Sequence, residues 1–180
     1  MVRGEAIYLT NLDPANAEVA RAWINDPEIN RYLLHGQIPV SIASEAAWYQ
    51  NAVTTWATGS AYNFEIHVAD DDRYIGNCGL HHVDMLHRSC EIGILIGETS
   101  EQNRGYGRDA IMALTRFGFD TLGLNRIEIR AQADNERSMH LYEKLGFKPV
   151  GRMREATYTF GHYVDEALFD MLASEWRARP

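Results

Sequence analysis

The sequence of 180 residues has little cysteine, no segment resembling a signal peptide and no long apolar run. Only Cys78 and Cys90 are present, without CxxC spacing, which suits a reduced, cytoplasmic protein in which both thiols are buried. A disulfide would require the two cysteines to face each other across a hairpin. No apolar stretch approaches the roughly 20 residues that span a bilayer, so no membrane partner is expected.

Positive charge is also scarce, with 17 Lys and Arg residues against 25 Asp and Glu residues and a net charge of -8. A nucleic-acid-binding protein needs a basic face to neutralise phosphates, so this class of partner is excluded. An acidic surface attracts cationic small molecules or basic peptides instead. The length and the lack of a linker-like segment predict a single domain over residues 1–180.

The apolar periodicity predicts an α+β protein. A strand over 7–10 precedes a helix that begins after Asp13-Pro14 and ends at Asp26-Pro27. The remaining predicted elements are a helix over 41–58, an antiparallel meander of strands over 62–68, 74–83 and 89–96, a helix over about 103–122, a strand over 126–131, a helix over 135–144 and strands over 148–155 and 163–172.

A glycine-containing turn at 102–108 is the most informative local feature, because it follows a buried strand and opens the long helix. The first turn of a helix has unpaired N–H groups and the positive end of the dipole, which together bind phosphate. Arg104 and Arg108 add charge there. The alternative is an ordinary glycine-rich helix start with two solvated arginines.

The same turn also matches a dinucleotide fingerprint, Gly105-x-Gly107-x-x-Ala110, with Glu128 near the expected acidic position. The preceding strand ends too far before Gly105, and a meander precedes the turn. Only one further βα unit follows, so a doubly wound sheet cannot be completed. The dinucleotide interpretation is therefore disfavoured.

Two motifs together resemble the GNAT acyl-CoA N-acetyltransferase family: Gln102-x-x-Gly105-x-Gly107 and Asn135-x-x-Ser138-x-x-x-Tyr142-Glu143-Lys144-Leu145-Gly146-Phe147. The resemblance extends from Ile7 to Leu172. Segments 23–29 and 161–165 are similar to the ribosomal-protein alanine N-acetyltransferase and spermidine acetyltransferase branches. The resemblance implies a mixed, mostly antiparallel central sheet with helices on both faces and a splayed strand pair that holds acetyl-CoA.

The resemblance also implies which residues hold this co-substrate. The backbone of the strand over 91–96 would pair with the pantetheine arm like an added strand, and the turn would hold the pyrophosphate. The implied cofactor-binding residues are Leu95, Ile96, Gln102, Asn103, Arg104, Gly105, Tyr106, Gly107, Arg108, Asn135 and Ser138.

Tyr142 lies where the family often places a general acid near the sulfur, and a phenol is protonated at neutral pH. The alternative is a tyrosine packed on the helix face. Glu91 is the candidate general base, acting through water, and its alternative is a charge at the end of a strand. Glu28 and Glu65 are lesser candidates for attracting a cationic substrate.

The histidines His81, His82 and His87 match no common zinc spacing, so no metal site is expected. His81 or His82 would line the acceptor cleft, depending on strand parity. Trp23, Tyr32, Trp48 and Tyr49 have helical spacing and are expected mostly in the core. Some of them would close over the acceptor.

The sequence thus predicts an enzyme that transfers the acetyl group of acetyl-CoA to a primary amine by direct attack in a ternary complex. The first choice of acceptor is a protein N-terminal, alanine-like amine. The alternatives are a polyamine or another cationic small molecule such as an aminoglycoside or amino sugar. An alternative of another class is a non-catalytic acyl-CoA-binding sensor. Because related branches of the family often pair, the resemblance also implies a homodimer.

Overall fold

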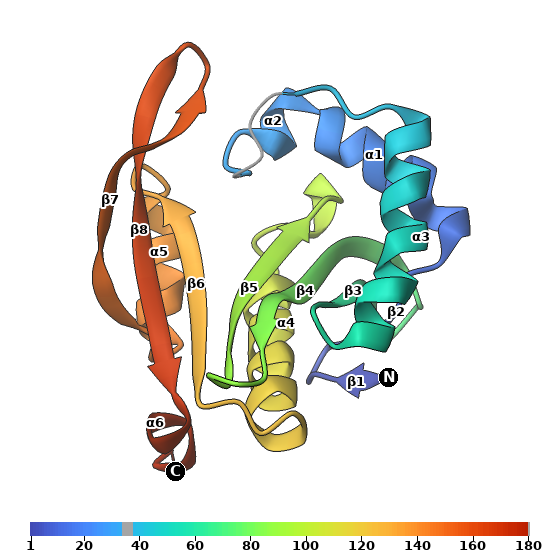
Figure 1. Ribbon diagram of the computed structural model, residues 1–180. Coiled ribbons are helices and arrows are strands. Elements are labelled where there is room, and N and C mark those ends of the chain that lie inside the picture. The colour runs from blue at the N-terminus through green and yellow to red at the C-terminus, as the bar shows by residue number, and fades with distance from the viewer. Residues whose placement is uncertain (34–37, 180) are drawn as a thin grey trace.

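The computed structural model describes residues 1–33 and 38–179, and its strands form one eight-stranded sheet in the order β1-β2-β3-β4-β5-β6-β8-β7 (Figure 1). The strands are β1 (Val2–Arg3), β2 (Ile7–Asn11), β3 (Tyr62–Val68), β4 (Tyr74–Asp84), β5 (Ser89–Ile96), β6 (Arg126–Gln132), β7 (Lys148–Thr159) and β8 (His162–Leu172). The predicted meander corresponds to β3, β4 and β5, which pair antiparallel.

Helices cover both faces of the sheet, with α1–α3 on one face and α4 and α5 on the other (Figure 1). Their bounds are α1 (Ala17–Asn25), α2 (Pro27–Asn30), α3 (Ile42–Thr58), α4 (Tyr106–Arg116), α5 (Glu136–Lys144) and α6 (Ala173–Arg177). This mixed, mostly antiparallel sheet between two helical layers confirms the predicted fold class. No helix of the described residues has both the length and the apolar character needed to cross a membrane.

The two faces of the sheet differ in polarity because side chains alternate along each strand. One set of positions, including Phe64, Ile92 and Ile129, is buried in the hydrophobic core with α4. The paired positions His81 and Glu91 belong to the other set, on the face covered by α1–α3. Strands β4 and β5 therefore carry these two ionisable groups on the face covered by α1–α3.

Local capping explains where several helices begin and end. Asp26 caps α2 by accepting from the Glu28 N–H at 2.9 Å, and Pro27 occupies its first turn. The sequence predicted that α1 ends here but not that a second short helix begins. Ser41 caps α3, and Gly59 ends it at φ +71°.

The predicted helix over about 103–122 is wrong at its start, whereas the chain stays helical to Thr121. The α4 helix begins only at Tyr106, because Asn103 and Gly105 both have positive φ values, which no helix accommodates. Beyond Arg116 the chain continues as a single π-helical turn, Phe117–Thr121. The sequence also missed β1 and α6, and it made β7 four residues too short.

Candidate active site

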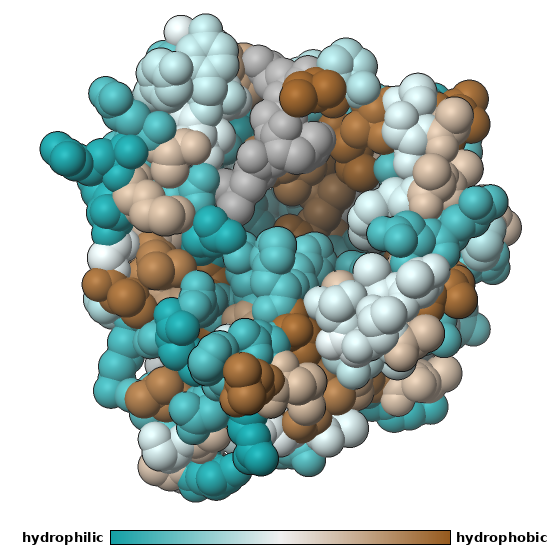
Figure 2. All heavy atoms as spheres, viewed as in Figure 1, coloured by the Kyte–Doolittle hydropathy of each residue, from teal (hydrophilic) through white to brown (hydrophobic). Residues whose placement is uncertain are grey.

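The main cleft opens where β5 and β6 separate. These strands are parallel neighbours, and their pairing runs from Ser89 opposite Arg126 to Ile92 opposite Ile129. From Gly93 onward β5 pairs only with β4. A cleft of about 1000 Å³ fills the opening, and Figure 2 shows the hollowed surface between the β7–β8 hairpin and helices α1–α3. The predicted splayed pair is thus present.

The register of β4 and β5 determines which backbone groups face the cleft. The Gly97 N–H donates to the Ile75 carbonyl at 2.9 Å, so the next pair inward, Gly76 and Ile96, is a non-hydrogen-bonded pair. The backbone N–H and C=O groups of Ile96 therefore point away from β4 and towards the cleft. By the same alternation, the backbone groups of Ile94 point there as well.

Leu95, the other predicted strand contact, has the opposite orientation. A Cβ atom on Gly76 would lie 2.1 Å from the Leu95 carbonyl oxygen, so this carbonyl faces β4. Its side chain lines the cleft, whereas its backbone does not offer an added strand any partner. The backbone groups at the open edge of β5 are therefore those of Ile94 and Ile96, because the sequence alone did not give the pairing register.

The predicted anion-binding turn closes one end of the cleft. Gly105 caps α4 with φ +89°, a conformation that strongly favours glycine, and it leaves the first N–H groups of α4 without a side-chain cap. The Gln102 amide donates to the Ile96 carbonyl at 3.0 Å and so ties the turn to the strand edge. Gly107 and Gln102 line the cleft. Tyr106 is half-buried and packs against the core.

The two arginines of the turn differ in their contacts. Arg104 donates to Glu101 at 2.8 Å, and Glu101 also accepts from Arg73 at 2.5 Å. These arginines, Arg73 first, hold the pKa of the Glu101 carboxyl below its ordinary value. Arg108 lies exposed in the first turn of α4, with no ion pair to another described residue. Its guanidinium is therefore free to meet an anion.

Tyr142 reaches the cleft from α5, on the core side of the sheet. Its side chain is 6% exposed and packs edge-on to Phe169 at 5.7 Å between ring centroids. Burial raises the pKa of Tyr142 to about 12, although a contact with the Ser138 hydroxyl acts in the opposite direction. Asn135 caps the same helix, because its Oδ1 accepts from the Ser138 N–H at 3.1 Å. All three predicted residues line the cleft.

Glu91 lies in the cleft, paired with an arginine that the sequence did not indicate. Arg130 on β6 donates from Nε to Glu91 Oε1 at 3.0 Å and from Nη2 to the other carboxylate oxygen. The same guanidinium lies 3.5 Å from Glu166 on β8. Both oxygens of Glu91 therefore contact the same guanidinium, and its negative charge is compensated locally.

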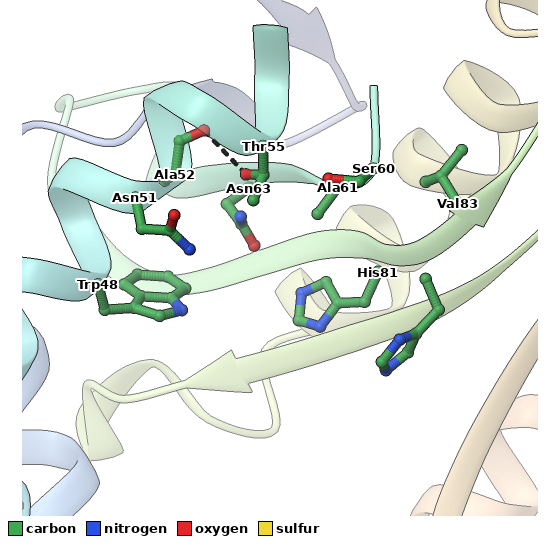
Figure 3. Close-up of a pocket in the computed structure, with 10 residues that line it drawn as sticks. Trp48, Asn51, Ala52, Thr55, Ser60, Ala61, Asn63, His81 and Val83 are labelled. Atoms are coloured by element: carbon green, nitrogen blue, oxygen red, sulfur yellow. Dashed lines mark hydrogen bonds between the residues drawn. The ribbon is translucent and has the colours of Figure 1, made fainter. Parts of the chain in front are cut away.

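A second, smaller pocket of about 370 Å³ lies between α3 and strands β3 and β4. Its polar lining includes Asn51, Thr55 and Asn63, and Figure 3 shows Asn51 and Asn63 pointing into the same space as Trp48. Asn63 is only 6% exposed, yet its side-chain amide makes no hydrogen bond to the rest of the described chain. Because neither polar atom of this amide is enclosed, both are open to a ligand group that enters the pocket.

His81 and His82 line both cavities and so lie at their junction. His81 is the inner of the two, and His82 is exposed with φ +50°. That one of these histidines contacts the acceptor stays a prediction, and both lie where it requires a cavity. Trp48 also faces this side and is 38% exposed, whereas Trp23 and Tyr49 are buried.

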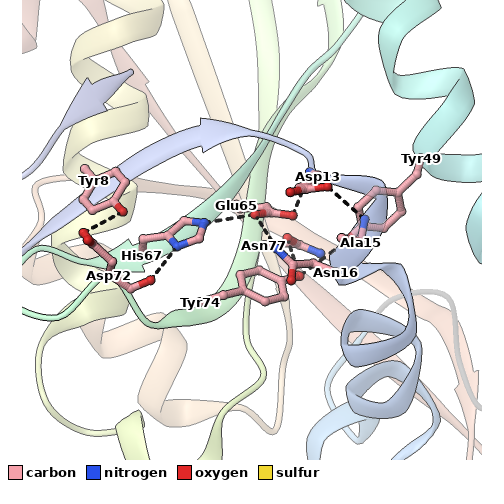
Figure 4. A network of polar contacts seen from close by, with 10 residues as sticks. All are labelled: Tyr8, Asp13, Ala15, Asn16, Tyr49, Glu65, His67, Asp72, Tyr74 and Asn77. Atoms are coloured by element: carbon pink, nitrogen blue, oxygen red, sulfur yellow. Dashed lines mark hydrogen bonds and ion pairs between the residues drawn. The ribbon is translucent and has the colours of Figure 1, made fainter.

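Glu65, a lesser candidate for substrate attraction, belongs to a separate polar network (Figure 4). Its carboxylate accepts from the Asp13 N–H at 2.8 Å and from the Asn16 side chain at 2.9 Å, and it contacts His67 at 2.9 Å. These contacts tie the start of the α1 segment to β3, which is a structural role. Glu28, the other lesser candidate, does line the main cleft.

Neither cysteine has the properties of a nucleophile. Both Cys78 and Cys90 are buried free thiols, and burial raises the pKa of Cys90 to about 12. Cys78 pairs in register with Ile94, so the two cysteines do not face each other across the β4–β5 hairpin. The described residues contain no group of three or more His, Cys, Asp or Glu side chains that could hold a metal ion.

The structure thus gathers most of the predicted site residues around one cleft. Glu91, Leu95, Ile96, Gln102, Gly107, Asn135, Ser138 and Tyr142 line it. The other predicted residues, Asn103, Arg104, Gly105, Tyr106 and Arg108, lie along the turn and the first turn of α4 beside it. A free strand edge, an uncapped helix start and a large cleft fit the pantetheine arm and the pyrophosphate of acetyl-CoA.

Sequence reasoning missed Arg130, Arg137 and Asn63. Arg137 lines the cleft from the first turn of α5. The alternation of Arg126 to Ala131 contained a weak signal for Arg130, since every second residue of this strand is polar. The position of Asn63 in the smaller pocket became visible only once its strand was placed beside α3.

Strands that separate beside an uncapped helix start are the architecture of acyl-CoA-dependent N-acetyltransferases. The family model of the acetyltransferase (GNAT) domain matches residues 7–148. The chain therefore belongs to this family, and it is an acetyl-CoA-dependent N-acetyltransferase.

Curated relatives and solved structures agree with this family. The chain is 28% identical over 176 residues to the protein named "Putative ribosomal N-acetyltransferase YdaF" of Bacillus subtilis (strain 168), covering 96% of this chain and 94% of that one. It is 29% identical over 127 residues to a spermidine N(1)-acetyltransferase of Vibrio cholerae, covering 66% and 73%. A crystal structure of spermidine N-acetyltransferase from Vibrio cholerae with CoA and spermine shares the fold, with a TM-score of 0.87, 23% identity and coverage of 96% and 98%.

Proposed function

We propose that the protein acetylates the N-terminal amine of a polypeptide, with an alanine-like first residue. The observation that carries this proposal is the second pocket beside the main cleft. Its lining, as far as the chain is described, has no Asp or Glu but offers the neutral amides of Asn51 and Asn63. An amide side chain donates and accepts at once, as a peptide group does, so this lining is complementary to the backbone that follows an acceptor amine.

A polyamine is the second candidate acceptor, and a specific observation favours it. Glu28, Asp134 and Glu136 line the main cleft, and a cationic chain is attracted by carboxylates. A relative is named a spermidine N(1)-acetyltransferase. The pocket beyond His81 lacks such carboxylates, which ranks the polyamine below the polypeptide.

Acetyl-CoA supplies the acetyl group as a thioester, and the amine attacks it directly in a ternary complex. In this proposal Ile94 and Ile96 hold the pantetheine arm through their backbone groups, with Leu95, Asn135 and Ser138 around it. The turn from Gln102 to Arg108 holds the pyrophosphate. Tyr142 donates a proton to the leaving sulfur, since its phenol is protonated at neutral pH. Glu91 lies on the acceptor side with its charge compensated by Arg130, and the amine attacks in its neutral form.

The test is a panel of amines incubated with acetyl-CoA, with free thiol measured over time. The panel contains a hexapeptide that begins with Ala, the same peptide with an acetylated N-terminus, spermidine and an aminoglycoside. Turnover of the free peptide alone supports the proposal, and preferential turnover of spermidine replaces it with the polyamine function. CoA binding without turnover of any amine points to the sensor alternative.

We further propose that the chain forms a homodimer in the cytoplasm. Its two buried thiols suit a reducing compartment.

The homodimer is supported by the β7 strand, which forms an edge of the sheet and exposes Val150 and Met153, a surface that a second copy would cover. Sedimentation velocity over a range of concentrations tests the dimer, and a monomer at every concentration contradicts it.

A further inference from the structure

His81 occupies the position at which the two cavities meet. It lies on β4 directly opposite Glu91 on β5, and paired residues of neighbouring strands present their side chains on the same face. This face is the one covered by α1–α3, where the acceptor pocket lies, and Figure 3 shows the His81 ring at the floor of that pocket. An amine that reaches from the pocket into the main cleft must therefore pass His81.

Two glycines create the space for the imidazole. A Cβ atom on Gly79 would lie 2.8 Å from His81 Nε2, and one on Gly93 would lie 3.1 Å from His81 Cε1. The ring thus lies over Gly79 and Gly93, which are themselves paired across β4 and β5. Any larger residue at either position would displace the ring, so the backbone of both strands fixes its location.

The His81 ring has no hydrogen-bonding partner among the described residues, and its nitrogens are not enclosed. Burial lowers the pKa of His81, although the nearby charge of Glu91 acts in the opposite direction. The ring is therefore neutral at pH 7 and has a free lone pair.

The charged groups around the ring are few. Glu91 faces it from β5 and is paired with Arg130 on β6, and His82 neighbours it on β4. The residues of α3 and β3 that line the same pocket are uncharged.

We propose that His81 is the proton acceptor for the acceptor amine, an assignment that rests on the proposed N-acetyltransferase function. The amine nitrogen forms its bond to the acetyl carbon and gives one proton to the imidazole. The carbon–sulfur bond breaks, and the sulfur takes a proton from Tyr142. The products are the acetylated amine and the free thiol, and water returns the proton from the imidazolium to the tyrosinate.

Glu91 has a supporting role in this assignment. Its carboxylate is already paired with Arg130, so it stabilises the imidazolium that forms and does not itself take the proton. This differs from the expectation that Glu91 is the base, and the two assignments predict different pH profiles.

The first test compares His81→Gln with His87→Gln, a change at an exposed histidine of the β4–β5 turn outside both cavities. With the hexapeptide that begins with Ala, H81Q should lower kcat/KM about 10²-fold at pH 7, whereas H87Q should match the wild type. The limb of kcat/KM that falls at acidic pH should disappear in H81Q. In Glu91→Gln that limb should remain and shift to lower pH, because the charge that favours the imidazolium is gone.

The second test does not depend on turnover. NMR follows the resonances of the His81 ring, which are assigned by comparison with H81Q. The wild-type protein is titrated with acid first by itself and then in the presence of the hexapeptide, both times without acetyl-CoA. Its resonances should shift on addition of the peptide and not with the N-acetylated peptide.

An H81Q variant that retains the wild-type rate and acidic limb overturns the assignment while the N-acetyltransferase function stands. If instead the decrease of kcat/KM at acidic pH disappears in E91Q, Glu91 is the proton acceptor, and the assignment to His81 is overturned. A wild type that acetylates no amine overturns the proposed function and this assignment together.

Discussion

Replacing Tyr142 by Phe removes one hydroxyl group and leaves the packing of the ring intact. The ring lies 5.7 Å from Phe169 and 6.5 Å from Phe147 between centroids, so a phenylalanine fills the same space. The hydroxyl is the part that faces the cleft, since the residue is otherwise buried in the core. The substitution therefore separates a chemical role of Tyr142 from a structural one.

The expected loss of rate follows from the protonation state. With a pKa of about 12, only about one Tyr142 in 10⁵ is ionised at pH 7, so nearly every molecule can donate a proton. Loss of a general acid lowers kcat by about 10²-fold, which corresponds to about 2.7 kcal/mol of transition-state stabilisation. The free energy of unfolding should change by no more than about 1 kcal/mol, because only a hydroxyl contact with Ser138 is lost.

The assay measures thiol release under saturating acetyl-CoA, and calorimetry measures the affinity for CoA in parallel. A lower kcat with unchanged CoA affinity and unchanged melting temperature supports the role of Tyr142 as the acid. Tyr158→Phe is the matched control, since it removes a hydroxyl from a tyrosine that is 60% exposed and lines neither cavity, and it should retain the wild-type rate. If Y142F retains the wild-type kcat, the tyrosine is a packing residue and another group protonates the sulfur.

Three further changes test the cofactor turn and the sheet. Gly105→Val should weaken CoA binding about tenfold in calorimetry, because the φ of +89° at this position is strained for any side chain, even though an added Cβ meets no atom within 4 Å. An unchanged affinity for CoA would show that the turn is not part of the binding site. Gly76→Ala should lower the free energy of unfolding in urea by about 2 kcal/mol, since its Cβ would lie 2.1 Å from the Leu95 carbonyl oxygen, whereas Gly151→Ala, with no atom within 4 Å, should be nearly neutral. Asp109→Ala should lower the free energy of unfolding by about 3 kcal/mol in the same measurement, because the Asp109 carboxylate accepts hydrogen bonds from three backbone N–H groups before and at the start of β2. A decrease of less than about 0.5 kcal/mol would contradict that role.

The succession of elements along the chain and the meander of β3, β4 and β5 were predictable because hydrophobic alternation and short turns are local properties. The start of α4 was not, since the positive φ values of Asn103 and Gly105 depend on how the turn packs against β5. The short α2 helix and the terminal α6 helix were missed for a related reason. Helices of four or five residues have too few positions for a periodic pattern, and tertiary contacts and caps stabilise them.

The site was predictable where a motif is contiguous and not where it depends on strand pairing. Gln102, Gly105 and Gly107 lie close together in sequence, as do Asn135, Ser138 and Tyr142. By contrast, the partner of Glu91 is 39 residues away on a strand whose parallel register had to be known. The exchange of Leu95 for Ile94 as a backbone contact has the same origin, because a shift of one residue in register reverses which groups face the cleft.

The negative charge of the chain is compatible with an anionic co-substrate because the structure separates the two. Glu91 and Glu166, which would otherwise repel a phosphate-bearing ligand, share the guanidinium of Arg130. Glu101 is held by Arg73 and Arg104 beside the anion-binding turn. These three carboxylates are thus compensated by arginines from other elements, so they do not oppose the binding of an anionic co-substrate.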